Sequence, residues 1–191
     1  MAINLQKGQR IDIGLTKLTI GLGWDPNEST GYDFDLDASA IMIDSQRKLV
    51  SEEYFVFYNN LTSPDGALTH TGDDPSGKNS DGDDDEAIMI DLEKVDQRVE
   101  EILFVVTIED FERRRQNFGQ VRNSYIRIVD QNSNREIAKY ELDEDFSIET
   151  GIEFGRLYKK NGSWKFEASG IGYRADLGFF LEKYYKGEII K

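Results

Sequence analysis

The stretch IEFGRLYKKNGSWKFEA, residues 152 to 168, decides the fold class of this chain. It holds two runs rich in apolar and aromatic residues, 152–158 and 164–168, separated by Lys160-Asn161-Gly162-Ser163. Asn-Gly is a preferred pair at the centre of a tight β-hairpin, because both central positions take a positive φ angle. The stretch therefore predicts two neighbouring antiparallel strands.

Similar strand-like runs recur along the chain. A turn over residues 130–134 predicts a second antiparallel pair, and Gly14 predicts a bend or bulge in a strand that spans residues 11–20. Helix is the minority, with a short one expected within 93–101 and another over 175–185, where apolar and aromatic side chains have helical spacing. The remaining predicted strands cover residues 34–43, 54–58, 87–92, 102–108, 125–129 and 136–142.

Many short strands separated by Gly, Asp and Asn turns favour a β-sandwich over a parallel α/β sheet. The predicted fold class is mainly β: a single-domain β-sandwich of antiparallel strands with long acidic loops and a short C-terminal helix. The chain of 191 residues is long enough for one substantial core, and no Pro/Gly/Ser-rich linker divides it. We expect residues 1–191 to form one domain, in which 72–86 is a long functional loop.

Composition excludes several classes of function. The chain has no Cys, which excludes disulfides, thiolate metal sites and cysteine nucleophiles. The sequence pI near 4.5 argues against nucleic acid as a partner, because recognition of phosphates depends on Lys and Arg.

The N-terminus lacks the apolar run of a secretory signal, and no apolar stretch reaches the roughly 18 residues that span a bilayer. We expect a cytoplasmic protein.

Two short segments hold most of the negative charge. Residues 24–37 carry five acidic side chains and no basic one, and residues 64–86 carry eight acidic side chains and one Lys. Their net charges of −5 and −7 make up −12 of the formal −14. Carboxylates this crowded repel one another, so protonation, solvation in a disordered loop or a metal ion must offset the repulsion. A bound divalent cation is the most economical of these explanations.

The first acidic segment contains a strict alternation, Asp33-Phe34-Asp35-Leu36-Asp37-Ala38. In a strand, its three aspartates share one face while Phe34, Leu36 and Ala38 pack inward. The second segment, residues 70–86, supplies glycines for sharp turns and many oxygen ligands, which suit the six to eight oxygens that Ca²⁺ binds. No cluster of His or Cys favours Zn²⁺ or Cu.

Several alternatives bear on the same residues. Neither acidic segment fits the EF-hand pattern, which requires Gly at position 6 and Glu at position 12. A solvated acidic loop without metal remains an alternative. His70 is the only histidine, and we expect it to support the loop through hydrogen bonds rather than to act in catalysis. The run 113–115, three arginines, is interpreted as a solvated turn or strand end, with contact to an anion or partner as the alternative.

Taken together, these motifs resemble the TerD family of tellurium-resistance proteins over nearly the whole chain. The residues that carry the resemblance are Gly21-Leu22-Gly23-Trp24-Asp25, Tyr32 to Ala40, Phe57-Tyr58-Asn59-Asn60, His70 to Asp74, the acidic run Gly82 to Glu86, Leu103 to Ile108, Phe118 to Val121, Tyr140-Glu141-Leu142 and Gly162 to Phe166. The resemblance implies a β-sandwich that binds Ca²⁺ through its acidic loops in bacterial stress and tellurite-resistance systems, without a known catalytic activity.

The resemblance also implies a set of metal ligands and two or more bound Ca²⁺ ions. Asp74 stands where relatives usually have Asn, and the loop before Glu86 is longer than usual. The candidate ligands are Asp25, Asp33, Asp35 and Asp37 from the first segment and Gly72, Asp73, Asp74, Asp83, Asp84, Asp85 and Glu86 from the second.

Three hypotheses for function follow. The first is a non-enzymatic Ca²⁺-binding stress-response protein, associated with tellurite resistance, whose metal-ordered loops recruit partners. The second is a Ca²⁺-dependent membrane-surface domain, and the third is a hydrolase that uses the same carboxylates with Mg²⁺ or Mn²⁺. We expect other proteins of the tellurite-resistance and stress set as partners, membrane-associated ones included. Direct binding of tellurite is not expected, because the chain lacks thiols and carries a strongly negative field.

Overall fold

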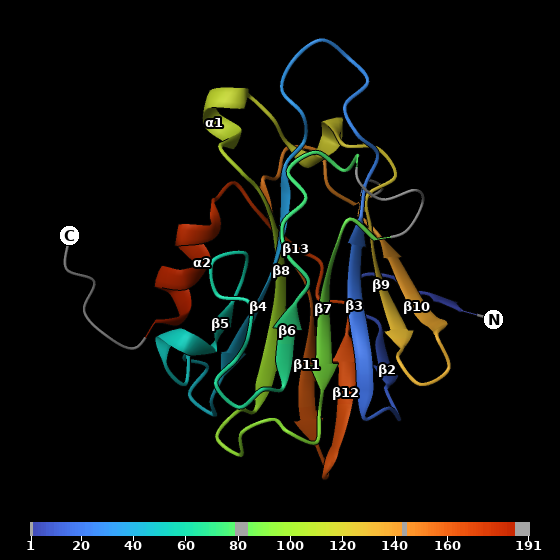
Figure 1. Cartoon of the computed structure of the whole chain (residues 1–191), viewed down its shortest axis with the longest axis vertical. Coiled ribbons are helices and arrows are strands. Elements are labelled where there is room, and N and C mark those ends of the chain that lie inside the picture. The colour runs from blue at the N-terminus through green and yellow to red at the C-terminus, as the bar shows by residue number, and fades with distance from the viewer. Residues whose placement is uncertain (1, 79–83, 143–144, 186–191) are drawn as a thin grey trace.

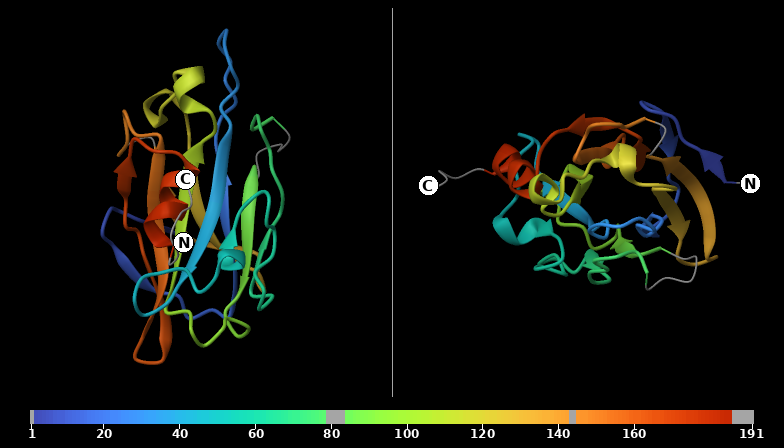
Figure 2. Two further views of the ribbon diagram at one scale, coloured as in Figure 1. Left: turned by 90° about the vertical axis from the view of Figure 1, so that its left-hand side faces the viewer. Right: turned by 90° about the horizontal axis from the view of Figure 1, so that it is seen from above.

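Two β-sheets packed face to face form the body of the protein (Figures 1 and 2). The computed structural model describes residues 2–78, 84–142 and 145–185. Sheet A has the strand order β1 (Ile3–Asn4), β10 (Arg135–Glu141), β9 (Tyr125–Asp130), β3 (Lys17–Gly23), β7 (Glu86–Asp91) and β6 (Leu68–His70). Sheet B has the order β2 (Arg10–Asp12), β12 (Ser163–Glu167), β11 (Gly151–Lys160), β8 (Glu101–Ile108), β4 (Leu36–Ile43) and β5 (Phe55–Val56), and β13 (Ile171–Tyr173) also pairs with β11.

The pairings between these strands are antiparallel, except that β1 runs parallel to β10. The helical elements are short. They comprise the 3₁₀ turns Glu52–Tyr54 and Phe118–Gln120, the helix α1 (Phe111–Arg114) and the C-terminal helix α2 (Leu177–Tyr184). The predicted mainly β sandwich with a short C-terminal helix is confirmed. In the part of the chain that the structure describes, no helix is long and apolar enough to cross a membrane.

Both predicted hairpins are present. β11 and β12 pair in a register that places Lys160 opposite Ser163, so the connection is the two-residue turn formed by Asn161 and Gly162. Their φ angles are 52° and 76°, the left-handed values that this turn requires. β9 and β10 form the second hairpin, around the turn at residues 130–134.

Two sequence predictions are wrong. Residues 11–20 do not form one bent strand, because β2 belongs to sheet B and β3 to sheet A, and the chain crosses between the sheets around Gly14, whose φ is 59°. Residues 93–100 form turns and irregular chain rather than a helix, and residue 101 begins β8. Side-chain oxygens of Asp91 and Asp96 accept backbone N–H groups two residues later, at 3.2 and 2.8 Å, and such local bonds compete with helix formation.

The core lies between the sheets and is densest around the centre of sheet B. All eight residues of β4 are buried, and Phe104 of β8 stacks on Phe154 of β11 with ring centroids 5.9 Å apart. Helix α2 covers part of sheet B, since Phe180 is fully buried and the Tyr184 hydroxyl donates to Glu153 Oε2 at 2.9 Å. Apolar packing of this kind accounts for most of the stability of a sandwich.

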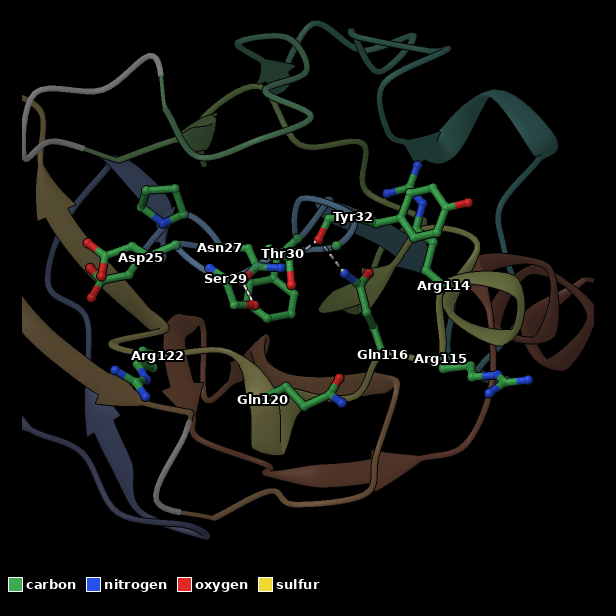
Figure 3. A pocket seen from close by; sticks show the side chains of 14 residues that line it. Asp25, Asn27, Ser29, Thr30, Tyr32, Arg114, Arg115, Gln116, Gln120 and Arg122 are labelled. Carbon is green, nitrogen blue, oxygen red and sulfur yellow. Dashed lines mark hydrogen bonds between the residues drawn. The ribbon is translucent and has the colours of Figure 1, made fainter.

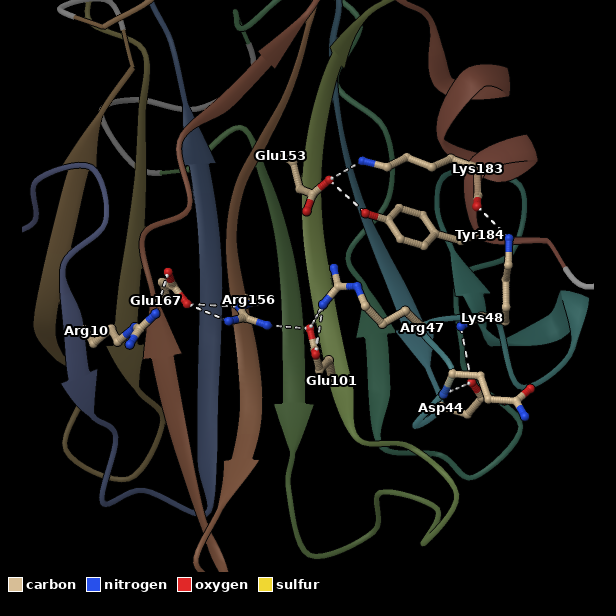
Figure 4. A network of polar contacts seen from close by, with 11 residues as sticks. Arg10, Asp44, Arg47, Lys48, Glu101, Glu153, Arg156, Glu167, Lys183 and Tyr184 are labelled. Atoms are coloured by element: carbon tan, nitrogen blue, oxygen red, sulfur yellow. Dashed lines mark hydrogen bonds and ion pairs between the residues drawn. The ribbon is translucent and has the colours of Figure 1, made fainter.

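Charged side chains cross sheet B in an alternating row (Figure 4). Arg156 on β11 occupies the middle of the row, with Nη2 2.7 Å from Glu167 Oε2 and Nη1 2.8 Å from Glu101 Oε2. Arg10 extends the row beyond Glu167 at 3.4 Å, and Arg47 extends it beyond Glu101 at 2.9 Å. The row joins β2, β12, β11 and β8 by ion pairs in addition to their backbone hydrogen bonds.

One end of the sandwich carries the acidic segments. In Figure 1 the loop 24–35, residues 71–78 after β6 and helix α1 all lie at the same end of the two sheets. Trp24 anchors this end, because its indole N–H donates to the carbonyl of Phe34 at 3.2 Å and its ring packs over Gly77. Segments far apart in sequence are thereby held beside one another.

Candidate metal centre

Three carboxylates, two from the start of β4 and one from the loop after β6, converge at this end of the sandwich. Asp35 immediately precedes β4, Asp37 is the second residue of β4, and Asp73 lies in the loop that follows β6. One oxygen from each lies within 4.8 Å of the others. Asp35 and Asp37 are two residues apart and so project from the same face of the extended chain, as the sequence predicts. We call these three residues the carboxylate cluster.

Burial makes the cluster electrostatically unfavourable by itself. Asp37 is only 3% exposed, and its Oδ2 is buried without a hydrogen-bond partner among the described residues. Burial, reinforced by the nearby charges of Glu86 and Asp35, raises the pKa of Asp37 to about 9. Burial also raises the pKa of Asp35, and the adjacent Arg114 offsets only part of that increase. A proton or a cation must therefore stabilise this site.

Glu86 and His70 hold the backbone on both sides of the cluster. Glu86, only 1% exposed, accepts the N–H of Ala38 at 2.7 Å and the N–H of Asp74 at 3.4 Å. Ala38 follows Asp37, and Asp74 follows Asp73, so one carboxylate holds both segments of the site, the start of β4 and the loop after β6. His70 Nε2 lies 2.9 Å from the carbonyl oxygen of Ala38 and 3.5 Å from Glu86 Oε2.

Burial also raises the pKa of Glu86, against the effect of its hydrogen bonds to His70 and Ala38. The prediction that His70 supports the loop through hydrogen bonds is confirmed. Glu86, predicted as a ligand, accepts backbone N–H groups next to the cluster and is not one of its three converging carboxylates.

Two basic side chains, Arg114 and Lys78, contact the first acidic segment. Arg114 of α1 donates from Nη1 to Asp35 Oδ2 at 3.2 Å. Lys78 Nζ lies 2.6 Å from Asp33 Oδ1. Asp33 is therefore not part of the cluster, although the alternating pattern placed it on one face with Asp35 and Asp37. The reason is that β4 begins only at Leu36, so residues 33–35 form a loop end rather than strand.

The remaining candidate ligands have other roles in this structure. Asp25 is exposed and accepts from Asn123 at 2.6 Å. Asp74 is buried, and its Oδ1 accepts the N–H groups of Ser76 and Gly77, which shapes the loop. Gly72 has a φ of 115°, which permits the sharp turn into Asp73.

The aspartates of the last acidic run, residues 83–85, also contact residues outside the cluster where the structure describes them. Asp84 Oδ1 lies 2.8 Å from Arg127 Nε and accepts from the Tyr125 hydroxyl at 3.2 Å, and Asp85 Oδ2 accepts the N–H of Trp24 at 2.9 Å. Asp83, like Asp81, lies outside the described residues. Asp84 is thus bound to β9 and Asp85 to the residue that follows β3, and neither is among the three carboxylates of the cluster.

Sequence reasoning missed several residues around the site. Gln116 donates from Nε2 to the carbonyls of Tyr32 and Asp33, at 3.0 and 3.1 Å, and so holds the first acidic loop. Burial raises the pKa of Tyr58, and the nearby charges of Glu109 and Asp37 raise it further. Arg114 belongs to the run that was interpreted as a solvated turn, yet its side chain is only 18% exposed. No local signal marks these contacts, because the partners of Arg114 and Gln116 lie about 80 residues earlier.

A cavity of about 540 Å³ adjoins the site (Figure 3). The loop 25–32 forms one wall, and Arg114, Gln116 and Arg122 are among the residues that line the other. Figure 3 shows Arg114 beside Tyr32 at one edge of this cavity. The Arg114 guanidinium carbon lies 5.9 Å from the centre of the Tyr32 ring.

The donors of the cluster suit a hard divalent cation. All three groups offer oxygen, and opposite oxygens around one Ca²⁺ are about 4.6–5.2 Å apart, so oxygens within 4.8 Å of one another can bind the same ion. The buried Oδ2 of Asp37, which has no hydrogen-bond partner, is a further unsatisfied ligand atom. The residues present therefore fit Ca²⁺ chemically, whereas Zn²⁺ prefers nitrogen and sulfur ligands.

Comparison with known proteins agrees with this architecture. A Streptomyces coelicolor homologue of the telluride resistance protein TerD has the same fold, with a TM-score of 0.75 at 20% identity over 88% of this chain and 96% of that chain. Among curated proteins, the uncharacterized protein YceE of Bacillus subtilis is 49% identical over 96% of this chain and 98% of its own length.

Two further relatives have descriptive names. The tellurium resistance protein TerD of Serratia marcescens is 46% identical, and general stress protein 16U of Bacillus subtilis is 45% identical, each over 96% of this chain and 97% of its own length. The family model of the TerD domain matches residues 1–184. With whole-length relatives, a matching family model and the two-sheet fold in agreement, this chain belongs to the TerD domain family.

Proposed function

We propose that this chain is a non-enzymatic Ca²⁺-binding stress-response protein that contributes to tellurite resistance by recruiting partners. The observation that carries the proposal is the carboxylate cluster of Asp35, Asp37 and Asp73, in which a buried oxygen of Asp37 lacks a hydrogen-bond partner. An acidic cluster alone is common on protein surfaces, but a buried carboxylate oxygen without a partner is costly and calls for a ligand.

The cluster residues would bind the ion directly, and their neighbours would position them. Asp35 and Asp37 come from the entrance to β4, and Asp73 comes from the loop after β6. Glu86 and His70 hold the backbone next to each of them, which corresponds to the supporting role of outer residues in metal sites. Backbone carbonyls and water would complete the six to eight oxygens of Ca²⁺.

Calcium would order the loops by binding only the folded site. A ligand that binds the folded state alone stabilises it by about 2.7 kcal/mol at a hundredfold excess over Kd. The ion would remove the repulsion between Asp35, Asp37 and Asp73 and join two loops that are about 36 residues apart in sequence. A surface ordered in this way can bind a partner at a lower entropic cost.

A binding role, rather than catalysis, is supported by the names of the relatives. They refer to tellurium resistance and general stress and describe no reaction. The absence of Cys and the net charge of −14 argue that protection against tellurite is indirect. Other proteins of the resistance and stress set are the partners that this proposal requires.

Calorimetric titration of the full chain with CaCl₂ after removal of bound metal tests the proposal. We expect saturable binding, with Asp73→Asn weakening the Kd about tenfold or more because a charged ligand is lost. Asp12→Asn is the matched control, since Asp12 lies on β2, is largely exposed and pairs with Lys165. Absence of binding heat together with an unchanged melting temperature at millimolar Ca²⁺ would contradict the proposal. The fitted stoichiometry decides whether two or more ions bind.

A further inference from the structure

Arg114 forms an ion pair with Asp35 and so neutralises part of the negative charge of the carboxylate cluster. Its Nη1 lies 3.2 Å from Asp35 Oδ2, and the two side chains are only 18% and 12% exposed. Arg114 ends α1, whereas Asp35 lies at the entrance to β4, so the contact joins two separate segments of the fold. An ion pair shielded from solvent in this way is stronger than one on an open surface.

The contact is also incomplete. Arg114 makes one hydrogen bond to Asp35, not the two parallel bonds of a bidentate pair, and its Nε is buried without a hydrogen-bond partner among the described residues. A guanidinium in this position compensates the charge of Asp35 without satisfying its own donors. Arg114 is therefore a partner that another cation can replace.

A divalent cation in the cluster would have to compete with this guanidinium. Asp35 is both the partner of Arg114 and one of the three converging carboxylates. Two positive groups on one partly buried carboxylate lie within a few ångströms of each other, where their repulsion is weakly screened. Full occupancy of the cluster by a divalent cation and the present position of Arg114 are thus mutually unfavourable.

We propose that Arg114 is a built-in competitor of the divalent cation: it neutralises Asp35 in the metal-free protein and is displaced when the cation binds. The inference rests on the proposed function, because it specifies how cation binding at that same cluster is regulated. Arg114 thereby lowers the affinity of the site and raises the cation concentration at which the loops become ordered.

The cavity next to the cluster has room for the Arg114 side chain after it leaves Asp35. Arg114 lines the cavity of about 540 Å³ and lies near the face of Tyr32, so a change of side-chain rotamer can move the guanidinium from Asp35 toward open space (Figure 3). Arg113 already lies 5.1 Å from the centre of the Tyr32 ring, so the displaced guanidinium would move into the cavity rather than onto that ring. Such a movement requires no change in the sheets.

The neighbouring residue provides a matched control. Arg113 carries the same charge, is adjacent in sequence and pairs with Asp110 rather than with a member of the cluster. Its side chain is 60% exposed. Replacing Arg113 therefore changes the net charge equally and removes its contact with the Tyr32 ring, while leaving the Arg114–Asp35 contact in place.

The experiment compares Ca²⁺ binding by the wild-type full chain with R114Q, R114K and R113Q, by titration calorimetry at pH 8 and constant ionic strength. We expect R114Q to bind Ca²⁺ at least about fivefold more tightly, R113Q to remain within about twofold, and R114K to lie between wild type and R114Q. Tighter binding distinguishes a competitor from a structural support, whose loss would weaken binding. An unchanged or weaker Kd for R114Q would overturn the inference while leaving calcium binding by the wild type intact.

A second measurement covers the case in which R114Q does not fold. In the wild-type protein, the side-chain Nε–H resonance of Arg114 should shift over the same Ca²⁺ range as binding, while that of Arg113 stays in place. An Arg114 resonance that does not respond to saturating Ca²⁺ would overturn the inference. Binding by R114Q without binding by wild type would support it, and absence of binding by all four proteins would overturn both the inference and the proposed function.

Discussion

Gly72 donates its backbone N–H to Nδ1 of His70 at 3.0 Å, and this bond selects the tautomer of the neutral ring. A nitrogen that accepts an N–H carries no proton, so a neutral His70 must carry its proton on Nε2. That proton points to the carbonyl oxygen of Ala38, 2.9 Å away. The fully buried ring thus links the loop before Asp73 to the strand that carries Asp37.

Each end of this ring can be tested separately. His70→Asn keeps an acceptor near the position of Nδ1, and His70→Gln keeps a donor near that of Nε2. We expect each to reduce the free energy of unfolding by about 1–3 kcal/mol, because one buried polar group loses its partner. Urea unfolding in EGTA measures the loss. If either variant were as stable as wild type, the corresponding hydrogen bond would not matter for stability.

The stability of the metal-free protein should fall as the pH rises. The pKa of Asp37 is about 9 in the folded protein against an ordinary value of 3.8. The folded state therefore holds a proton that the unfolded state releases, and the stabilisation is complete below about pH 4 and lost as the pH approaches 9. One such group contributes a slope of at most about 1.4 kcal/mol per pH unit. Asp37→Asn should flatten the curve measured by urea unfolding between pH 5 and 8.

Two glycines on either side of β6, Gly66 before it and Gly77 after it, allow the cost of backbone strain to be distinguished from the cost of a steric clash. Gly77 and Gly66 have φ angles of 64° and 68°, so replacement of either by Ala costs roughly 1–2 kcal/mol of backbone energy. Only at Gly77 would the new methyl meet a neighbour, the indole nitrogen of Trp24 at 2.7 Å. We expect Gly77→Ala to destabilise the protein more than Gly66→Ala and to change the tryptophan fluorescence. Equal losses from both would show that Trp24 moves aside without cost.

The charged row on sheet B should depend on its central residue. Arg156 is 23% exposed and joins Glu101 to Glu167, whose side chains are 17% and 15% exposed. Arg156→Met leaves both partly buried carboxylates without this partner, and we expect a loss of about 1–3 kcal/mol in the free energy of unfolding.

Arg10→Met is the control for this substitution. Arg10 is 60% exposed and contacts Glu167 at 3.4 Å, so its replacement should cost less than about 0.5 kcal/mol. Similar losses from the two variants would contradict the central role of Arg156.

Much of this fold could be predicted because its signals are local. The Asn161-Gly162 turn requires two left-handed residues, and the alternation around Leu36 and Ala38 places both in the core. The predicted helix within 93–101 fails because the side chains of Asp91 and Asp96 bond to nearby N–H groups, a competition that apolar spacing does not reveal.

The candidate site was predictable only in part. Asp35, Asp37 and Asp73 were among the predicted ligands, but so were Asp33 and Glu86, which pair with Lys78 and with backbone N–H groups. Charge density along the sequence identifies acids that are near one another in the chain. It does not identify which of them a distant Arg114 or Lys78 neutralises, because tertiary contacts decide that.

The bond from Glu86 to Ala38 also joins one sheet to the other. Glu86 begins β7 in sheet A, and Ala38 lies in β4 of sheet B, so the Glu86 side chain spans the gap between the sheets at this end, next to that of His70 from β6. The length of the Glu86 side chain therefore sets the distance between the two sheets at which this hydrogen bond can form. An aspartate would keep the charge but fall one carbon short, so the two sheets would have to close up or leave the strand amide without its acceptor. Shape, and not only charge, therefore constrains which acid can occupy this position.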